Sequence, residues 1–145
     1  MKPNRSIPAA VITPVLIYPD VREAVDWLSG AFGFVERIRV GESHRAQLSF
    51  GDGAVIVGDA HGDRRPPRRG EVTHSVMVRV ADANAHCERA RGHGAHIAME
   101  PTDFEYGERQ YIAEDPAGHR WTFSETIADI SPEEWGGIAV AEAAL

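Results

Sequence analysis

Histidine and carboxylate side chains are the groups in this chain that could bind a metal ion or move a proton. His74, His119 and Glu125 lie within or beside apolar runs that alternate like strands. Imidazole and carboxylate groups are the usual ligands of catalytic zinc, iron and manganese. Regular alternation does not aim these three side chains at one place, and only a bulge or a slipped register would do so. We therefore predict that His74 is a core or interface histidine.

Other titratable side chains could serve a catalyst that needs no metal. Glu108, Asp59 or His74 could act as a general base, but their spacing singles out no pair. Three more histidines lie on or just after a second predicted helix that Gly92 and Gly94 interrupt, and we predict that they lie at the surface: His86, His93 and His96.

Composition limits the partners that this chain can have. Its 145 residues contain 15 Lys and Arg against 22 Asp and Glu, a net charge of −7, which argues against nucleic acid and anionic membranes as partners. The exception is a run of four arginines and two prolines over residues 64–69, which we interpret as a solvated linker.

Cysteine content and hydropathy predict a cytoplasmic protein. Cys87 is the only cysteine, so it cannot form an intrachain disulfide, and a reducing compartment is expected. Its place on the predicted face of a helix indicates a small core residue. The chain lacks a run of about 18 apolar residues, and its first residues lead into a strand.

The elements that must position these groups occur twice. An apolar run ending at Asp20 precedes an amphipathic segment, and the same order recurs around Asp82. Each half then closes with two strands joined by a turn. A unit of roughly 60 residues is too small to bury a good core alone. The two copies should therefore pack together, with a ligand site where they meet.

Periodicity and capping residues predict two βαβββ modules in one α+β domain, with curved mixed sheets around a cleft. Asp20 should cap a helix over residues 21–32 and Asp82 a helix over 83–91. The predicted strands cover residues 10–18, 35–40, 45–50, 54–59, 72–80, 96–99, 108–113 and 119–124. We place the first module at 8–60, a linker at 61–71, the second module at 72–126 and a tail at 127–145. Pro14 should put the first strand at a sheet edge or delay its pairing.

Two stretches of sequence resemble a known superfamily. Residues 20–28 with Phe32, Gly33 and Phe34 are similar to the first helix of the vicinal oxygen chelate superfamily, which includes glyoxalase I, extradiol dioxygenases and bleomycin-resistance proteins. Residues 107–111 and 114–121 resemble its last hairpin, in the form of the glyoxalase-like and bleomycin-resistance-like subgroup. The resemblance implies a homodimer with clefts between sheets of one or both chains.

The resemblance also implies where metal ligands would stand. In the metal-using members the equivalent positions are Thr13, Val57, Ser75 and Thr122. Hydroxyl groups and a valine provide neither imidazole nor carboxylate donors. We therefore expect the fold without its metal cofactor.

Strand alternation predicts the lining of the cleft. Counting across the turns places Gln47 opposite Val57 and Gln110 opposite Thr122, and it points Trp121 and Phe123 into the core. Two aromatic residues in the loop before the last hairpin could close over a ligand. The predicted ligand-binding residues are Thr13, Gln47, Val57, Ser75, Met77, Arg79, Phe104, Tyr106, Gln110, Arg120 and Thr122.

These residues favour a protein that binds a small amphipathic organic molecule without a metal, as in drug or metabolite sequestration. The alternative is a metal-dependent enzyme of the glyoxalase or dioxygenase type, a lyase or dioxygenase, with its ion held by His74, His119 or glutamates in a different register. The expected partners are a small organic ligand and a second copy of the chain.

Overall fold

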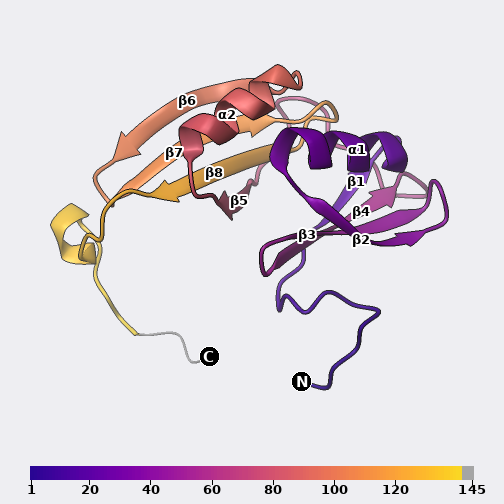
Figure 1. Ribbon diagram of the computed structural model, residues 1–145, viewed down its shortest axis with the longest axis horizontal. Helices are drawn as coiled ribbons and strands as arrows, with labels where there is room; N and C mark the ends of the chain where they lie inside the picture. Colours follow the sequence, from indigo (N-terminus) through magenta and orange to yellow (C-terminus); the bar gives the residue numbers. More distant parts are fainter. Residues whose placement is uncertain (142–145) are drawn as a thin grey trace.

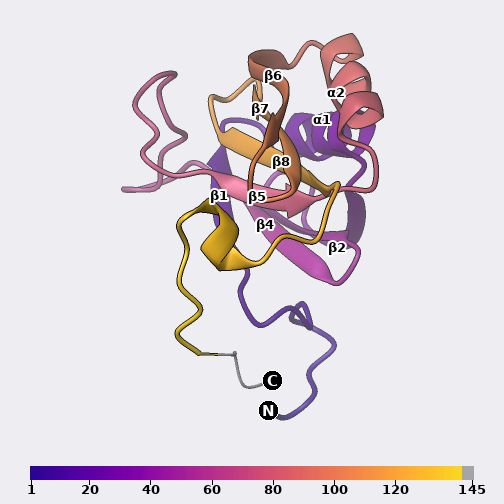
Figure 2. The ribbon, with the colours of Figure 1, turned by 90° about the vertical axis from the view of Figure 1, so that its left-hand side faces the viewer.

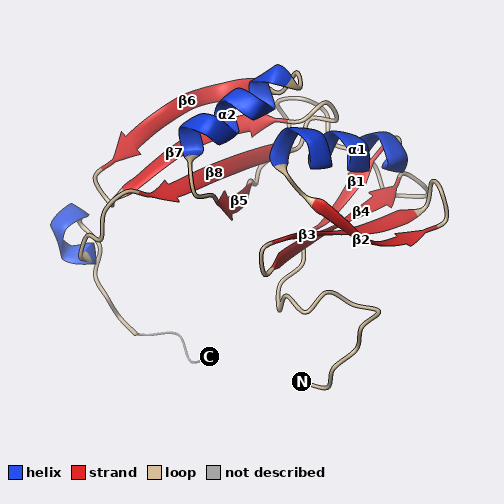
Figure 3. Ribbon diagram, viewed as in Figure 1, coloured by secondary structure: helices blue, strands red, loops and turns tan. Residues whose placement is uncertain are grey.

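The computed structural model describes residues 1–141, which form two four-stranded mixed sheets, each with one helix (Figures 1 and 3). The first module comprises β1 (Val15–Tyr18), α1 (Val21–Phe32), β2 (Val35–Val40), β3 (Arg45–Phe50) and β4 (Gly53–Asp59), in sheet order β1-β4-β3-β2. The second comprises β5 (Val76–Arg79), α2 (Ala83–Gly92), β6 (His96–Phe104), β7 (Glu108–Glu114) and β8 (Arg120–Thr126), in order β5-β8-β7-β6. The predicted α+β pair of βαβββ modules is confirmed.

Aspartate caps begin both long helices, as predicted. The side chain of Asp20 accepts a hydrogen bond from the Glu23 N–H, and that of Asp82 accepts one from the Ala85 N–H. Helix α1 ends at Gly33, whose φ of 88° is the left-handed conformation that glycine adopts without cost. The fully buried side chains of helix α2 are all small: Ala83, Cys87 and Ala90.

Three strands differ from the prediction by four or five residues at one end. Strands β1 and β5 begin at Val15 and Val76, later than the predicted residues 10 and 72. Pro14 has no N–H for the ladder, although its carbonyl accepts from Ile56 N–H at 2.9 Å. The prediction of an edge position with late pairing is therefore confirmed for β1. Strand β6 continues to Phe104, beyond the predicted residue 99.

Both helices lie on the same side of the two sheets, next to each other (Figure 1). The core beneath them contains a cluster of fully buried rings from both modules, including Phe32, Tyr111, Trp121 and Phe123. Trp121 and Phe123 thus lie in the core, as alternation predicted. The other side of each sheet carries no helix, and we call it the open face.

A buried carboxylate joins the modules beside this core. Asp115 is 1% exposed, and its Oδ2 accepts from Tyr18 O–H at 2.5 Å and from Trp121 Nε1–H at 3.1 Å. The backbone N–H groups of Ala117 and His119 donate to its Oδ1. Because Tyr18 belongs to β1 and the other donors to the second module, this network fixes the two units to each other.

Two segments outside the modules approach the open faces from the same side of the molecule (Figure 2). Near the N-terminus, the carbonyls of Arg5 and Ser6 accept hydrogen bonds from Arg37 and Gln47, and Pro8 is buried. After β8 the chain forms a short 3-10 helix, η1 (Pro132–Trp135), at the far end of the second sheet. No helix among residues 1–141 is long and apolar enough to span a membrane.

Candidate ligand-binding face

The open face of the second sheet gathers most of the predicted ligand-binding side chains. Strand pairing places Arg79 beside Ser124, and Ser124 opposite Gln110. The next row contains Met77, Thr122 and Ile112. Because Trp121 and Phe123 point to the core, their neighbours on β8 must point to the open face. The predicted residues brought together here are Ser75, Met77, Arg79, Gln110, Arg120 and Thr122.

Hydrogen bonds fix the side chain of Gln110 at the centre of this face. Its Nε2 donates to Ser124 Oγ at 3.0 Å, and its Oε1 accepts from Tyr106 O–H at 3.0 Å. The Ser124 hydroxyl in turn donates to Glu108 Oε1 at 2.7 Å. Its hydrogen is thereby committed to the carboxylate. The face therefore presents an ordered polar strip beside the exposed thioether of Met77.

A cation and an anion lie on this face without an ion pair between them. The guanidinium of Arg79 donates to Thr126 Oγ1 at 2.9 Å. Thr126 is the register partner of Glu108. The ion pairs of the described residues include neither Arg79 nor Glu108, which leaves both groups with capacity for a ligand. Arg120, by contrast, lies near the Glu114 carboxylate at 3.7 Å.

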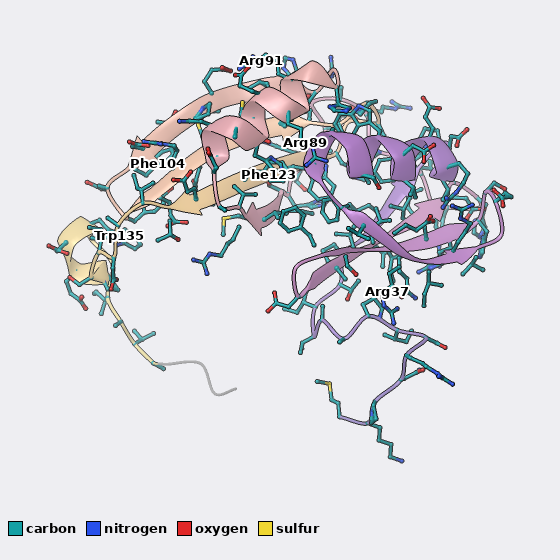
Figure 4. All side chains as sticks on the ribbon, in the orientation of Figure 1. Arg37, Arg89, Arg91, Phe104, Phe123 and Trp135 are labelled. Atoms are coloured by element: carbon teal, nitrogen blue, oxygen red, sulfur yellow. The ribbon has the colours of Figure 1, made fainter. Side chains whose placement is uncertain are left out.

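An aromatic cluster closes one end of the face. The rings of Phe104 and Tyr106 are stacked, with centroids 5.3 Å apart and an interplanar angle of 8°, and Tyr106 also packs on Trp135 at 5.4 Å. Figure 4 shows Phe104 and Trp135 at the same end of the second sheet. Phe104 ends β6, so the prediction that it lies in a loop is wrong. Tyr106 does lie in the turn between β6 and β7.

The first hairpin has a different register from the prediction. Gln47 pairs with Ile56, not Val57, because the turn contains two residues, Gly51 and Asp52, between Phe50 and Gly53. Val57 pairs with Ala46 and is fully buried in the core, so its predicted place in the cleft is wrong. Gln47 does point to the open face, but the N-terminal segment covers it to 9% exposure.

The last hairpin is also shifted. Gln110 pairs with Ser124, and Thr122 pairs with Ile112, so the predicted pairing of Gln110 with Thr122 is wrong. The connection between Glu114 and Arg120 is folded by hydrogen bonds to the Asp115 side chain. The observed connection has five residues, 115–119, and the predicted pairing also leaves five, residues 114–118, so the connection lies one position later in the chain than predicted. The shift is two residues, which leaves Gln110 on the same face.

A groove runs from this face into the junction of the modules. Its volume is about 360 Å³, and it lies between the end of the β3–β4 hairpin and β5. The wall is mostly apolar, with charges only at Asp52 and Arg79. Thr13, another predicted ligand residue, lies in the chain between two residues of this wall, and its hydroxyl is 3.5 Å from Ala10 O. The lining includes Ile12, Pro14, Phe34, Phe50, Val76 and Met77.

The side chains that could bind a metal do not converge. His119 is 7% exposed, with its Nε2 at 2.7 Å from Ile17 O and its ring on Tyr18. Asp59, the last residue of β4, accepts hydrogen bonds from the imidazoles of His44 and His61. Glu125 accepts from Ala83 N–H at the start of α2. Within residues 1–141, no group of three or more His, Cys, Asp or Glu side chains is placed to hold a metal ion.

The four residues at the positions where metal-using members of the superfamily carry ligands are poor ligands for a divalent cation. Ser75 and Thr122 lie within hydrogen-bonding distance, with 2.7 Å between their hydroxyl oxygens. Val57 is in the core, and Thr13 offers only a hydroxyl. This donor set does not fit a divalent catalytic ion.

His86 lies at the junction of the two helices and not at the surface, which corrects the sequence prediction. Its Nε2 is 2.8 Å from the backbone carbonyl oxygen of Phe32, and its Nδ1 is 2.5 Å from the hydroxyl oxygen of Tyr111. Burial lowers the pKa of this imidazole. The sequence pattern missed it because the neighbours of His86 on α2 are polar, and such a pattern does not indicate that the side chain reaches into the core.

The predicted set of ligand-binding residues omits Ser124 and Trp135, which both belong to the face. Ser124 was on the correct side by alternation and could have been included. Trp135 follows a capped segment without a counterpart in the first module, so the internal repeat could not place it.

Comparison with known proteins identifies several relatives. A family model described as Glyoxalase/Bleomycin resistance protein/Dioxygenase superfamily matches residues 10–123. The chain is 26% identical over 133 residues to an uncharacterized protein of Mycobacterium tuberculosis (strain ATCC 25618 / H37Rv), which covers 85% of this chain and 78% of that protein. TioX from Micromonospora sp. ML1 is 32% identical, with a TM-score of 0.64, covering 79% of this chain and 97% of TioX. The fosfomycin resistance protein FosX from Listeria monocytogenes shares the fold, with a TM-score of 0.66 at 14% identity over 88% of this chain and 98% of that chain.

Proposed function

The chain belongs to the Glyoxalase/Bleomycin resistance protein/Dioxygenase superfamily, and from this premise we propose that it binds a small amphipathic organic molecule on the open face of the second sheet without a metal ion. Such binding would sequester a drug or a metabolite. It requires a complementary surface and no catalytic acid or base.

The donor set at the four family positions carries this proposal. Thr13, Ser75 and Thr122 offer neutral hydroxyl groups, and Val57 is buried in the core. Divalent catalytic ions need imidazole, carboxylate or thiolate ligands. With these residues at the four positions, the chain has the fold but offers no imidazole, carboxylate or thiolate there to bind the ion.

The composition of the open face supports an organic ligand. Met77 and Ile112 offer apolar surface in one row, and Arg79, Gln110 and Glu108 offer donors and acceptors beside it. The groove at the module junction extends this surface by about 360 Å³. Pockets for organic molecules combine a mainly apolar wall with a few placed polar groups.

We further propose that two chains associate with their open faces inward. Ile12 is 83% exposed, Val15 48% and Met77 63%. All three lie on or beside the edge strands β1 and β5. Exposed apolar side chains that lie together on one surface mark an interaction site. A second copy of the chain would cover them and enclose the ligand.

Calorimetric titration tests the binding proposal. The full chain is purified without chelators, its metal content is measured, and it is titrated with a panel of hydrophobic natural products before and after EDTA treatment. We expect saturable binding by at least one compound, unchanged by EDTA. A stoichiometric bound ion, or binding that EDTA abolishes, would contradict the proposal, and so would the absence of saturable binding across the panel.

A further inference from the structure

The chain segment after β8 contributes a ring to the proposed ligand face, although it lies outside the matched residues 10–123. Building on the proposed binding function, we propose that Trp135, Tyr106 and Phe104 form an aromatic platform for a planar ring of the ligand, and that Arg79 and Glu108 bind an amide-type substituent on that ring. The ligand class is an aromatic carboxamide.

The tail is held against the sheet by specific contacts. The backbone N–H groups of Ile127 and Ala128 both donate to Gly107 O, at 2.9 and 3.2 Å. Gly107 has a φ of 85°, and a Cβ atom added there would lie 2.3 Å from Ala128 O. The tail therefore approaches the β6–β7 turn as closely as a glycine permits.

A capping box then directs η1. The Ser131 N–H donates to Glu134 Oε2 at 3.1 Å, and the Ser131 hydroxyl lies 3.2 Å from the same atom. Pro132 occupies the first position of this short helix. These local interactions place Trp135 over Tyr106, with the two ring centroids 5.4 Å apart.

The platform is connected to the polar strip of the face. The hydroxyl of Tyr106 donates to Gln110 Oε1, so the ring that Trp135 contacts also orients the central amide. Trp135 remains 39% exposed, which leaves ring surface for a ligand. Aromatic rings prefer to stack on other flat π systems.

Strand pairing brings a donor and an acceptor within reach of the platform. Phe104 pairs with Glu108, and Glu108 pairs with Thr126, where the Arg79 guanidinium is bound. The distance from Phe104 to Thr126 is two strand spacings, roughly 10 Å. A flat bicyclic ring with one substituent spans most of this length.

The two charges select the substituent. A guanidinium can only donate and a carboxylate can only accept hydrogen bonds. A carboxamide satisfies both, because its C=O accepts from Arg79 and its N–H donates to Glu108. A carboxylate in the same place would meet the like charge of Glu108, and it has no hydrogen to donate.

Three small probes test this assignment by calorimetry or by NMR titration of the full chain. The probes are 2-naphthamide, 2-naphthoate and cyclohexanecarboxamide. We expect 2-naphthamide to bind at least several-fold more tightly than either of the others. The variant Trp135→Leu should weaken 2-naphthamide roughly three- to tenfold and leave cyclohexanecarboxamide unchanged. Ile138→Ala, which alters an 80% exposed apolar residue of the same tail, is the matched control.

The variant Glu108→Gln gives a second readout that does not depend on the tail. Its side chain can donate to a carboxylate, so the preference for 2-naphthamide over 2-naphthoate should fall or reverse. Equal weakening of both amides by Trp135→Leu, or an unchanged preference in Glu108→Gln, would overturn the inference. If compounds of the wider panel bind but the three probes show no aromatic amide preference, the inference fails and the proposed function stands. If no compound binds, both fail.

Discussion

Asp115 shows how a single residue holds the two modules in register. It accepts four hydrogen bonds in a site that is 1% exposed, and burial beside it raises the pKa of Tyr18 well above its ordinary value. Neutral tyrosine is therefore the donor. A buried acceptor with four donors is costly to remove, because every donor left behind is buried as well.

Removing parts of this network should destabilise the protein in proportion to the partners lost. We expect Tyr18→Phe to lower the free energy of unfolding by about 1.5–3 kcal/mol and Asp115→Ala by about 3–5 kcal/mol. Urea unfolding followed by circular dichroism measures both. Asp103→Asn, which breaks an exposed ion pair with Arg109, is the control and should change little. Equal, small effects of all three variants would show that the network is unimportant.

His86 should make stability depend on pH. Burial is the main cause of its lowered pKa, and the Arg89 charge lowers it further, against the opposing effect of Phe32 O. The unfolded chain binds a proton near the ordinary value of 6.5 and the folded chain only at lower pH. Stability should therefore rise with pH between the folded pKa and about 6.5, and fall as the pH drops through that window.

The expectation is tested by measuring the urea midpoint of unfolding at values between about pH 5 and pH 8, because histidines titrate in roughly this range. The variant His86→Gln should show a flatter profile than the wild type. His96→Gln replaces an exposed histidine and should keep the wild-type profile. A wild-type slope that survives in His86→Gln would assign the pH dependence to another group.

At the scale of elements, helices were easier to predict than hairpin registers. The spacing of Val21, Ala24, Val25, Leu28 and Phe32, with an aspartate before them, fixed the first helix because both signals are local. Hairpin register depends on how many residues the turn uses. The Gly51-Asp52 turn is one residue shorter than predicted, and the connection held by Asp115 has the predicted length but lies one residue later in the chain.

The candidate face was predictable to the extent that alternation decides it. Met77, Arg79, Gln110 and Thr122 share the open face as alternation predicts, and the two-residue shift of the last hairpin keeps Gln110 and Thr122 on it. Val57 was misplaced because a one-residue shift reverses it. Trp135 could not be predicted, since its position depends on tertiary contacts of a segment that the repeat does not contain.

Docking of the tail should depend on Gly107. We expect Gly107→Ala to release the segment after β8, because the new methyl group would collide with Ala128 O. Chymotrypsin cleavage at Trp135, followed by mass spectrometry, should become faster. Gly51→Ala is the matched control: Gly51 also has a positive φ, 57°, but nothing lies within 4 Å of an added Cβ. Equal cleavage rates in the two variants would contradict a specific role for the Gly107 contact.

At the scale of the whole molecule, we expect the exposed apolar residues on and beside the edge strands β1 and β5 to determine whether two chains associate. We expect Ile12→Glu to convert the proposed dimer into monomers, because a buried carboxylate without a partner is strongly unfavourable at an interface. Light scattering coupled to size-exclusion chromatography measures this. Val35→Glu changes a comparably exposed apolar residue on β2, at the opposite edge of the first sheet, and should leave the mass unchanged. A monomeric wild type at all concentrations would contradict the proposed association.

The N-terminal segment makes the open faces of the two modules unequal in the surface that they leave for a ligand. A duplicated fold offers two equivalent concave surfaces, yet Pro8 and the carbonyls of Arg5 and Ser6 occupy the one in the first module. Titration should therefore give a stoichiometry of one molecule per chain. The first surface then contributes to stability through its contacts with the N-terminal segment, and ligand binding is expected only on its counterpart.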